Sequence, residues 1–206
     1  MNPIILLYYK DEKLNDYFEK CAAYIKGYLK ENYPDAEIVE INDQKCNPVY
    51  VEEKLSEING REFLFASYCH GSRDSFNDPQ GNPFIKVNEN DHMLRDGLVF
   101  TNSCHSGAEL GPALMEKGAF FFVGFDDIVS IYPDYTETFA ACDNFPFLLY
   151  LMEDFTKNEK VEVERKIKNF YDQQIDKLLK KDVWAAKMLM TNRDSLVLYF
   201  SQEDKL

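Results

Sequence analysis

Six short apolar runs divide this chain, and helical spacing is found in most of the segments between them. Strands that alternate with helices form a mainly parallel sheet with helices on both faces, because consecutive parallel strands need a crossover connection. The sequence therefore predicts an α/β fold with a mainly parallel sheet of about six strands. The runs predicted as strands are residues 4–9, 36–41, 63–68, 98–102, 119–125 and 196–200.

Apolar residues recur every three or four positions in the segments between the runs, as they do on the buried face of a helix. Pro48 near the start of one segment and Gly60 after its end are typical helix boundaries. Pro146 is expected to kink or split a longer helix, because proline lacks the amide hydrogen that the helix ladder uses. The predicted helices cover residues 14–32, 48–59, 106–117, 136–155, 162–180 and 184–190.

Composition restricts the class of protein. A length of 206 residues suits one domain, residues 1–206, and 45% hydrophobic residues supply a large core. The net charge of −13 argues against a nucleic-acid partner, because phosphate binding needs a basic face. No apolar segment is long enough for a membrane span, and the start of the chain lacks the basic flank of a signal peptide. Five widely spaced cysteines without a Cys-x-x-Cys pair indicate free thiols, so we expect a cytoplasmic protein.

Two predicted strands end in residues that can carry chemistry. The strand at 63–68 runs into Cys69-His70-Gly71, and the strand at 98–102 runs into Ser103-Cys104. The carboxyl ends of parallel strands lie at one edge of a sheet, where α/β proteins bind their ligands. Residues 72–96 between these strands are rich in turn formers, and long loops at such an edge are often functional. His70 and Cys104 are therefore candidate site residues.

A histidine and a cysteine at neighbouring strand ends suit acyl transfer. A nucleophilic cysteine needs a base and hydrogen-bond donors for the developing oxyanion. If the two strands are neighbours, their backbones lie about 5 Å apart, and His70 and Cys104 can face each other. The N–H groups of Gly71 and Cys104 are the candidate oxyanion donors. A helix that starts just after Cys104 would also favour the thiolate, through its partly positive N–H groups.

Other interpretations of these residues remain open. Cys104 could be a packing residue and His70 could make a structural hydrogen bond. The two Cys-His pairs, Cys69-His70 and Cys104-His105, contain the residue types that zinc prefers, although neighbours on extended backbone point to opposite sides. A thioredoxin-like redox role is disfavoured, because it needs a Cys-x-x-Cys motif.

The sequences Tyr68-Cys-His-Gly71 and Asn102-Ser-Cys-His-Ser-Gly107 resemble those of the caspase-like cysteine peptidases: caspases, metacaspases, gingipain-like enzymes, separase and the bacterial CHAT domains. The order of strands and helices over residues 1–130 is also similar to theirs. The resemblance implies a three-layer caspase-like fold and a cysteine endopeptidase that acts through an acyl-enzyme without a cofactor. It assigns Cys104 as the nucleophile, His70 as the base, and the N–H groups of Gly71 and Cys104 as the oxyanion hole.

One position departs from the family pattern. Metacaspase-like members carry an aspartate two residues before the nucleophile, which helps to bind a basic side chain of the substrate, and this chain has Asn102 there. Asp126 and Asp127, just after the strand at 119–125, are alternative residues for a substrate pocket. The expected partner is a protein or peptide substrate, with no nucleic acid and no membrane. The alternative function is a caspase-like interaction module without catalytic activity.

Overall fold

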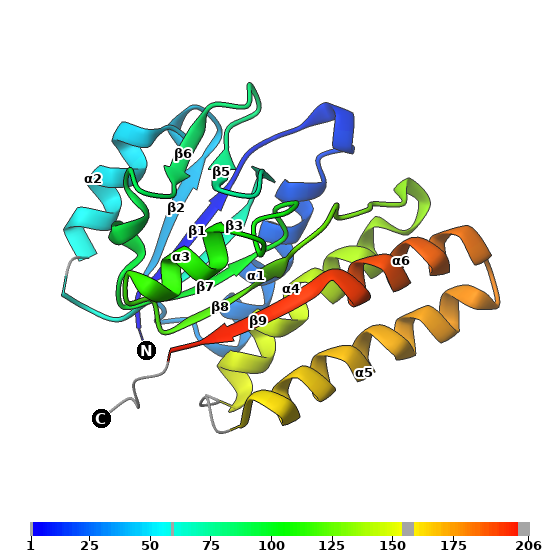
Figure 1. Ribbon diagram of the computed structural model, residues 1–206. Coiled ribbons are helices and arrows are strands. Elements are labelled where there is room, and N and C mark those ends of the chain that lie inside the picture. The colour runs from blue at the N-terminus through cyan, green and yellow to red at the C-terminus, as the bar shows by residue number, and fades with distance from the viewer. Residues whose placement is uncertain (1, 59, 154–158, 202–206) are drawn as a thin grey trace.

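The structure is a computed structural model that describes residues 2–58, 60–153 and 159–201. Its central element is a six-stranded sheet (Figure 1). The strand order is β2-β1-β3-β7-β8-β9. All pairs are parallel except β8 with β9, which is antiparallel. The predicted α/β fold with a mainly parallel sheet is confirmed. The strands are β1 (Ile4–Tyr8), β2 (Ile38–Asn42), β3 (Phe63–Tyr68), β7 (Gly97–Thr101), β8 (Phe121–Phe125) and β9 (Leu196–Phe200).

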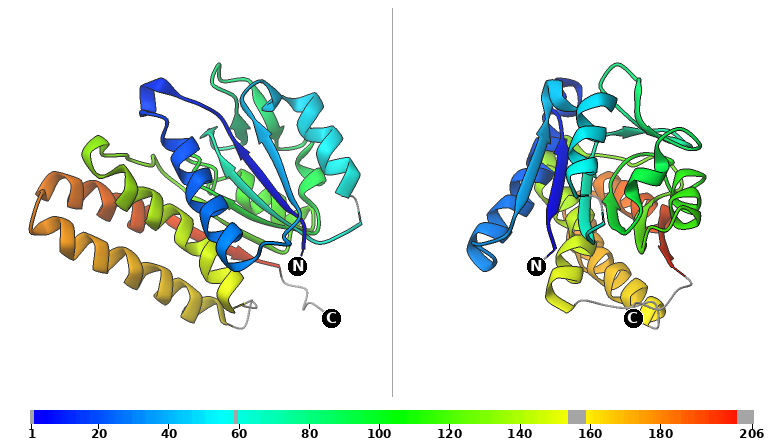
Figure 2. Two further views of the ribbon diagram at one scale, coloured as in Figure 1. Left: turned by 180° about the vertical axis from the view of Figure 1, so that it is seen from behind. Right: turned by 90° about the vertical axis from the view of Figure 1, so that its left-hand side faces the viewer.

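Helices cover both faces of this sheet and make three layers. Helices α1 and α4 pack together on one face, whereas α2 and α3 cover the other (Figures 1 and 2). Helices α5 and α6 form a hairpin, and α6 leads directly into β9. Across the described residues, no helix combines the length and apolar character that crossing a membrane requires. The helices are α1 (Tyr17–Asn32), α2 (Pro48–Ile58), α3 (Leu110–Glu116), α4 (Thr136–Glu153), α5 (Lys160–Leu179) and α6 (Val183–Ser195).

The four inner strands are buried along their whole length. A strand covered by helices on both sides has no solvent-facing side chains, so its sequence is continuously apolar and does not alternate. Strand β2, at one edge of the sheet, has a mixture of buried and exposed residues. The apolar runs in the sequence therefore correspond to the centre of the sheet.

Helix α3 begins later than its sequence predicts. Residues 104–109 form turns, and the helix starts only at Leu110. The amide of His105 donates to the Asp127 carbonyl, and the amide of Gly107 donates to the Phe125 carbonyl. His105 also has a left-handed backbone, with φ of 58°. These bonds to the end of β8 hold the segment outside the helix, so the prediction that a helix starts beside Cys104 is wrong.

Pro146 does not split α4, which runs without a break from Thr136 to Glu153. Proline removes one ladder hydrogen bond, but Pro146 is buried, and packing against the sheet and α1 outweighs the local loss. Of the two predicted effects, a kink or a split, the split is therefore wrong. The predicted end of this helix near Phe155 lies outside the described residues.

The predicted loop between β3 and β7 contains a second, antiparallel sheet. Its strands are β4 (His70–Gly71), β5 (Ser75–Asn77) and β6 (Pro83–Lys86), in the order β4-β5-β6. Strand β3 ends at Tyr68 and β4 begins at His70, so one residue connects the main sheet to this smaller sheet. The pairing with β5 holds the backbone of His70 and Gly71 in place beside the main sheet.

Candidate active site

The register between β3 and β7 sets His70 level with Cys104. These strands are parallel neighbours, and Ser67 is opposite Thr101. The pairing ends there; extended by three residues, the same register sets His70 level with Cys104, and the close approach of Gly71 to the Cys104 carbonyl oxygen shows that the two segments stay side by side. Neighbouring strands are about 4.8 Å apart, so the two residues lie within reach of each other. The predicted neighbourhood of the two strand ends is therefore confirmed.

Cys69 points away from this pair. Its sulfur lies 3.1 Å from the Ser67 hydroxyl and 2.9 Å from the Ser103 hydroxyl, in a fully buried cluster. Successive side chains of an extended segment point to opposite faces, so His70 faces the other side. There its ring makes an edge contact with Phe18 of α1, with 5.4 Å between centroids. The prediction that Cys69 faces the sheet packing is confirmed.

Asp11 orients the His70 ring. Its Oδ2 lies 2.8 Å from Nε2 of His70, and its carboxylate is almost buried. Because a carboxylate oxygen only accepts hydrogen bonds, Nε2 is the donor in this contact, and Nδ1 is the ring nitrogen that Asp11 leaves unused. The backbone is held as well, since the His70 amide donates to the Tyr9 hydroxyl at 2.7 Å. Hydrogen bonds thus fix both the ring and the backbone of His70.

Asp11 was not among the site residues predicted from the sequence. It lies three residues after the last residue of β1, and β1 is the neighbour of β3 on the side opposite β7. Parallel strands end at the same edge, so a carboxylate just after β1 could have been considered as a partner for His70. The missing information was the strand order, because three adjacent strands, β1, β3 and β7, supply Asp11, His70 and Cys104.

Gly71 lies against the backbone of the cysteine loop. A Cβ atom at this position would come within 2.7 Å of both the Cys104 carbonyl oxygen and the Ser103 Cβ. Only glycine permits this approach. The Ser72 amide donates to the Ser75 carbonyl, so Gly71 occupies a non-hydrogen-bonded position of the β4–β5 ladder and its N–H points away from β5. This N–H is therefore not used by the ladder.

Cys104 is half-buried, and its sulfur accepts a hydrogen bond from the Val129 amide at 3.3 Å. Burial raises the pKa of its thiol above the ordinary value, although the Val129 amide and the Cys104 amide oppose this effect. Carboxylates of Asp143 and Asp127 raise the pKa further. The prediction that the local structure favours a thiolate is therefore wrong for the free protein: the helix start that would favour it is absent, and desolvation dominates.

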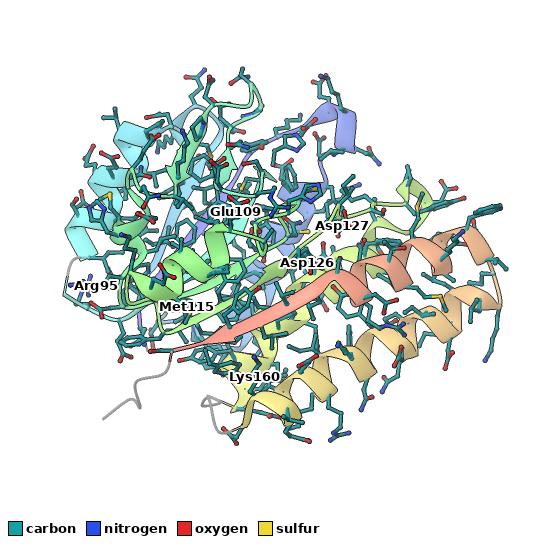
Figure 3. The ribbon with its side chains drawn as sticks, in the orientation of Figure 1. Arg95, Glu109, Met115, Asp126, Asp127 and Lys160 are labelled. Carbon is teal, nitrogen blue, oxygen red and sulfur yellow. The ribbon has the colours of Figure 1, made fainter. Side chains whose placement is uncertain are left out.

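Asp126 and Asp127 lie on the exposed loop that follows β8 (Figure 3). His105 contacts both, since its Nδ1 lies 3.4 Å from the Asp126 carbonyl oxygen and 3.8 Å from Oδ1 of Asp127. The Asp127 carboxylate also accepts a hydrogen bond from the Ile128 amide. His105, to which the sequence assigned no role, thus joins the cysteine loop to this neighbouring loop, and the two aspartates flank the site at its surface.

Asn102 lies beneath the site, with only 3% of its surface exposed. Its amide nitrogen lies 3.8 Å from the Cys21 sulfur, and within the described structure its Oδ1 is a buried oxygen without a hydrogen-bond partner. Next to it is Asp143 of α4, whose carboxylate accepts bonds from the hydroxyls of Tyr17 and Tyr171. Burial raises the pKa of Asp143 to about 7, against the effect of the two hydroxyls and the Asn102 amide. An acidic group thus lies close to Asn102.

The zinc alternative has no support in this geometry. No group of three or more His, Cys, Asp or Glu side chains suited to a metal ion occurs among the residues that the structure describes. Cys69 and His70 point to opposite sides, so the two Cys-His pairs do not converge. All five cysteines carry free thiols.

Comparison with known proteins leaves the site to be judged on its geometry. The chain matches no protein-family model and no curated protein.

Proposed function

We propose that this protein is a caspase-like cysteine endopeptidase in which Cys104 is the nucleophile and His70 the general base. The observation that carries the proposal is the alignment of three adjacent parallel strands. Cys104, His70 and Asp11 each follow one of these strands, and the carboxylate of Asp11 accepts a hydrogen bond from Nε2 of His70. A nucleophile, a base and an orienting group are the parts that covalent acyl transfer requires.

In the proposed reaction, His70 takes the thiol proton while the Cys104 sulfur attacks the carbonyl carbon of a peptide bond. The N–H groups of Gly71 and Cys104 donate to the oxyanion of the tetrahedral intermediate. The C–N bond then breaks, and the leaving amine takes the proton from His70. Water, deprotonated by His70, then attacks the thioester carbonyl. The C–S bond breaks, the Cys104 sulfur takes the proton back from His70, and the carboxylic acid product leaves.

The free protein represents a resting form in this proposal. The raised pKa keeps the Cys104 thiol protonated at neutral pH, so the base has to remove the proton during the attack. The Val129 amide, which donates to the sulfur, belongs to the same loop as Asp126 and Asp127. A substrate bound along this loop would displace solvent and bring its carbonyl to the sulfur.

Substrate recognition is assigned to the residues around the cysteine. Asp126 and Asp127 are exposed on the loop beside it, whereas Asn102 and Asp143 lie below it. The acidic surroundings of the site fit a protein or peptide segment that carries basic residues. The net charge of −13 is consistent with such a partner and disfavours a nucleic acid.

Labelling with a peptide-based, cysteine-directed electrophile tests the proposal. We expect one modified residue, Cys104, by mass spectrometry, with loss of labelling in Cys104→Ala and slower labelling in His70→Ala. Cys69→Ala is the matched control, because Cys69 is buried on the other face and its loss should leave labelling unchanged. Equal modification of the other cysteines, or unchanged labelling in Cys104→Ala, would contradict a peptidase site.

The second candidate is an interaction module with the same fold and no peptidase activity. The observation in its favour is the half-buried, protonated state of the Cys104 thiol. In this case the labelling rate of Cys104 would not depend on His70, and no member of a diverse peptide library would be cleaved. The two candidates are thus separated by the His70→Ala variant.

A further inference from the structure

The α5–α6 hairpin ends in a turn that exposes several large apolar side chains. We call residues 177–188 the hairpin tip. Figure 1 shows it at the end of the two helices, away from the sheet. Trp184 is 70% exposed and Val183 is 63% exposed, and Leu179 and Met188 are also exposed. Trp184 and Met188 are four residues apart on α6, so they share one side of the helix.

The hairpin tip is also basic. It contains four lysines and one aspartate, in a chain whose net charge is −13. The lysines are Lys177, Lys180, Lys181 and Lys187, and all four are exposed. The ammonium group of Lys187 lies 5.8 Å from the centre of the Trp184 ring, so charge and apolar surface are adjacent. This combination of positive charge and apolar surface differs from the acidic character of the whole chain.

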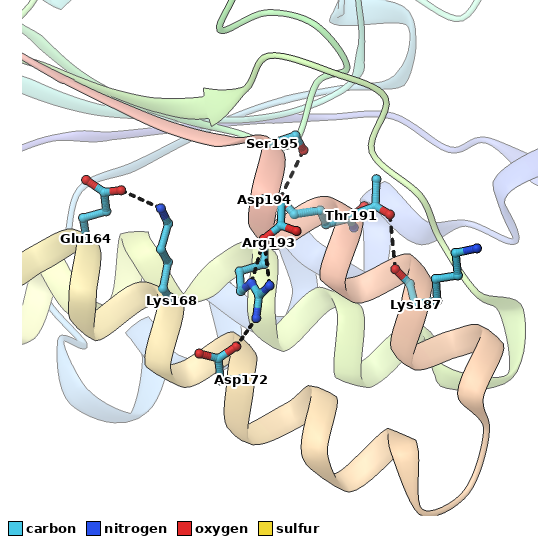
Figure 4. Close-up of polar contacts among 9 residues, drawn as sticks. Glu164, Lys168, Asp172, Lys187, Thr191, Arg193, Asp194 and Ser195 are labelled. Carbon is cyan, nitrogen blue, oxygen red and sulfur yellow. Dashed lines mark hydrogen bonds and ion pairs between the residues drawn. The ribbon is translucent and has the colours of Figure 1, made fainter.

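The shape of the hairpin tip is held by specific contacts. The Asp182 carboxylate caps α6 by accepting hydrogen bonds from the amides of Trp184 and Ala185, at 2.9 and 3.1 Å. Further along, Arg193 of α6 pairs with Asp172 of α5 and with its neighbour Asp194 (Figure 4). The exposed side chains therefore project from a fixed backbone, which lowers the entropy cost of binding a partner.

A chain of contacts connects α6 with the candidate active site. Asn192 of α6 is fully buried and makes two hydrogen bonds with the backbone of Ser130, both 2.8 Å long. The preceding residue, Val129, donates its amide to the Cys104 sulfur. Closer to the hairpin tip, the Asp182 carboxylate raises the pKa of the Tyr132 hydroxyl, so the loop that carries Val129 and the start of α6 are neighbours. A partner on the hairpin tip would therefore lie next to the loop that borders Cys104.

We propose that the hairpin tip is a docking surface for an acidic polypeptide segment of a partner protein, one that carries large apolar side chains among aspartates and glutamates. Charge complementarity carries this choice: the lysines attract carboxylates, while the indole of Trp184 supplies an apolar contact of the kind that dominates interface energies. An anionic membrane is the less favourable occupant, because an extended charged surface faces the whole molecule, whose net charge is −13, whereas a peptide segment contacts only the hairpin tip. The proposal does not depend on peptidase activity.

Fluorescence of Trp184 provides a direct test, since it is the one tryptophan in the chain. The probe is a synthetic amphipathic peptide with glutamates on one face and leucines on the other. We expect a blue shift of the emission and protection from acrylamide quenching as the peptide is added. Two further peptides serve as controls, one with lysine in place of glutamate and one with serine in place of leucine, and neither should bind.

Charge reversal makes the test specific for the hairpin tip. The variant Lys180→Glu/Lys181→Glu/Lys187→Glu should lose affinity for the acidic peptide by at least about tenfold. Its circular dichroism should be the same as that of the natural chain. The matched variant Lys30→Glu/Lys45→Glu/Lys160→Glu carries the same net charge and should bind as the natural chain does. A second measurement uses the fluorescence anisotropy of a labelled glutamate peptide. The variant Trp184→Ser should no longer bind this peptide.

Four results would contradict the proposal. The first is the absence of a blue shift with the glutamate peptide, and the second is an equal shift with the lysine peptide. The third is a blue shift with vesicles of phosphatidylserine and phosphatidylcholine that exceeds the shift with the peptide, because it would assign the hairpin tip to a membrane surface. Unchanged affinity in the triple charge-reversal variant would also contradict the assigned role of the lysines.

Discussion

The same dipeptide, Cys-His, follows the ends of β3 and β7, but its two copies are arranged in opposite ways. In the first copy the cysteine is buried among hydroxyls and the histidine faces the site. In the second copy the cysteine, Cys104, faces the site and His105 contacts the neighbouring loop. The two copies are offset by one position in the strand register, so Cys69 lies level with Ser103 and His70 with Cys104.

This offset places the histidine of one dipeptide and the cysteine of the other on the same face of the sheet. A shift of one residue in a strand exchanges the side chains that point to its two faces. If the dipeptides were in register, the two cysteines would pair on one face and the two histidines on the other. With the offset, the histidine of one strand lies beside the cysteine of the next. The four predictions below test this difference, from the largest expected effect to the smallest.

The two histidines should differ most in activity. We expect His70→Ala to lower the rate of peptide cleavage by about a thousandfold, because it removes the base of the reaction. His105→Ala should change the rate by less than about threefold, since His105 only joins two loops. Cleavage of a fluorogenic peptide library, with folding checked by circular dichroism, measures both. A similar loss in the two variants would remove the functional distinction between the dipeptides.

The two faces should also differ in their response to pH. On the Cys104 face, the folded protein keeps Asp143 protonated up to about pH 7, whereas the unfolded chain loses this proton near pH 4. Between these values unfolding releases a proton, so the free energy of unfolding should fall as pH rises, by about 4 kcal/mol. Urea unfolding from pH 4 to pH 8 measures the effect.

The variant Asp143→Asn should flatten this pH dependence and leave the protein more stable than the natural chain at pH 8. Ser103→Ala, on the Cys69 face, is the matched control: it should lower the free energy of unfolding by a similar amount at every pH, since it removes no titrating group. A pH dependence that persists in Asp143→Asn would show that another group causes it.

Gly71 should be sensitive to substitution because it lies against the cysteine loop. Gly71→Ala would place a Cβ atom 2.7 Å from the Cys104 carbonyl oxygen, so we expect it to destabilise the protein by about 1–3 kcal/mol. Gly27→Ala, in α1, is the control: its Cβ would meet nothing within 4 Å, and alanine favours a helix by about 0.5–1 kcal/mol. Equal stability of the two variants would refute the close contact.

The orienting carboxylate should have the smallest effect of the four. Asp11→Asn retains an oxygen that can accept the Nε2 hydrogen of His70 but removes the charge that stabilises the imidazolium. We expect cleavage to slow by about tenfold, which corresponds to about 1.4 kcal/mol in the barrier. The control is Asp43→Asn, which should leave the rate unchanged, because the Asp43 carboxylate accepts a hydrogen bond from the Lys10 amide and not from His70. An equal rate in Asp11→Asn would assign Asp11 to stability alone.

Much of the fold could be predicted from the sequence. The strands at 63–68 and 196–200 begin and end where their apolar runs predict. Errors arose where contacts between distant segments overrule local preference. Gly107 bonds to the Phe125 carbonyl, and this delays the start of α3. The buried packing of Pro146 likewise keeps α4 in one piece.

The candidate site was predicted in part. His70 and Cys104 were predicted to lie near each other because each follows the end of a parallel strand. This prediction required only that the two strands be neighbours, as β3 and β7 are. Asp11 was missed, because the sequence does not tell which strand lies on the other side of β3. The ionisation of Cys104 was predicted wrongly, since the degree of desolvation depends on the loop that carries Val129.

By itself, the sequence determined that the chain forms a parallel sheet and that His70, Gly71 and Cys104 lie at strand ends. It could do so because the periodicity of apolar residues records how each segment is buried within its own element. Only the tertiary structure decided the register that places His70 beside Cys104, the carboxylate that orients the ring, and the protonated state of the thiol. These three properties depend on which distant residues become neighbours and on how much water those residues exclude. The local pattern of apolar residues contains no information on either.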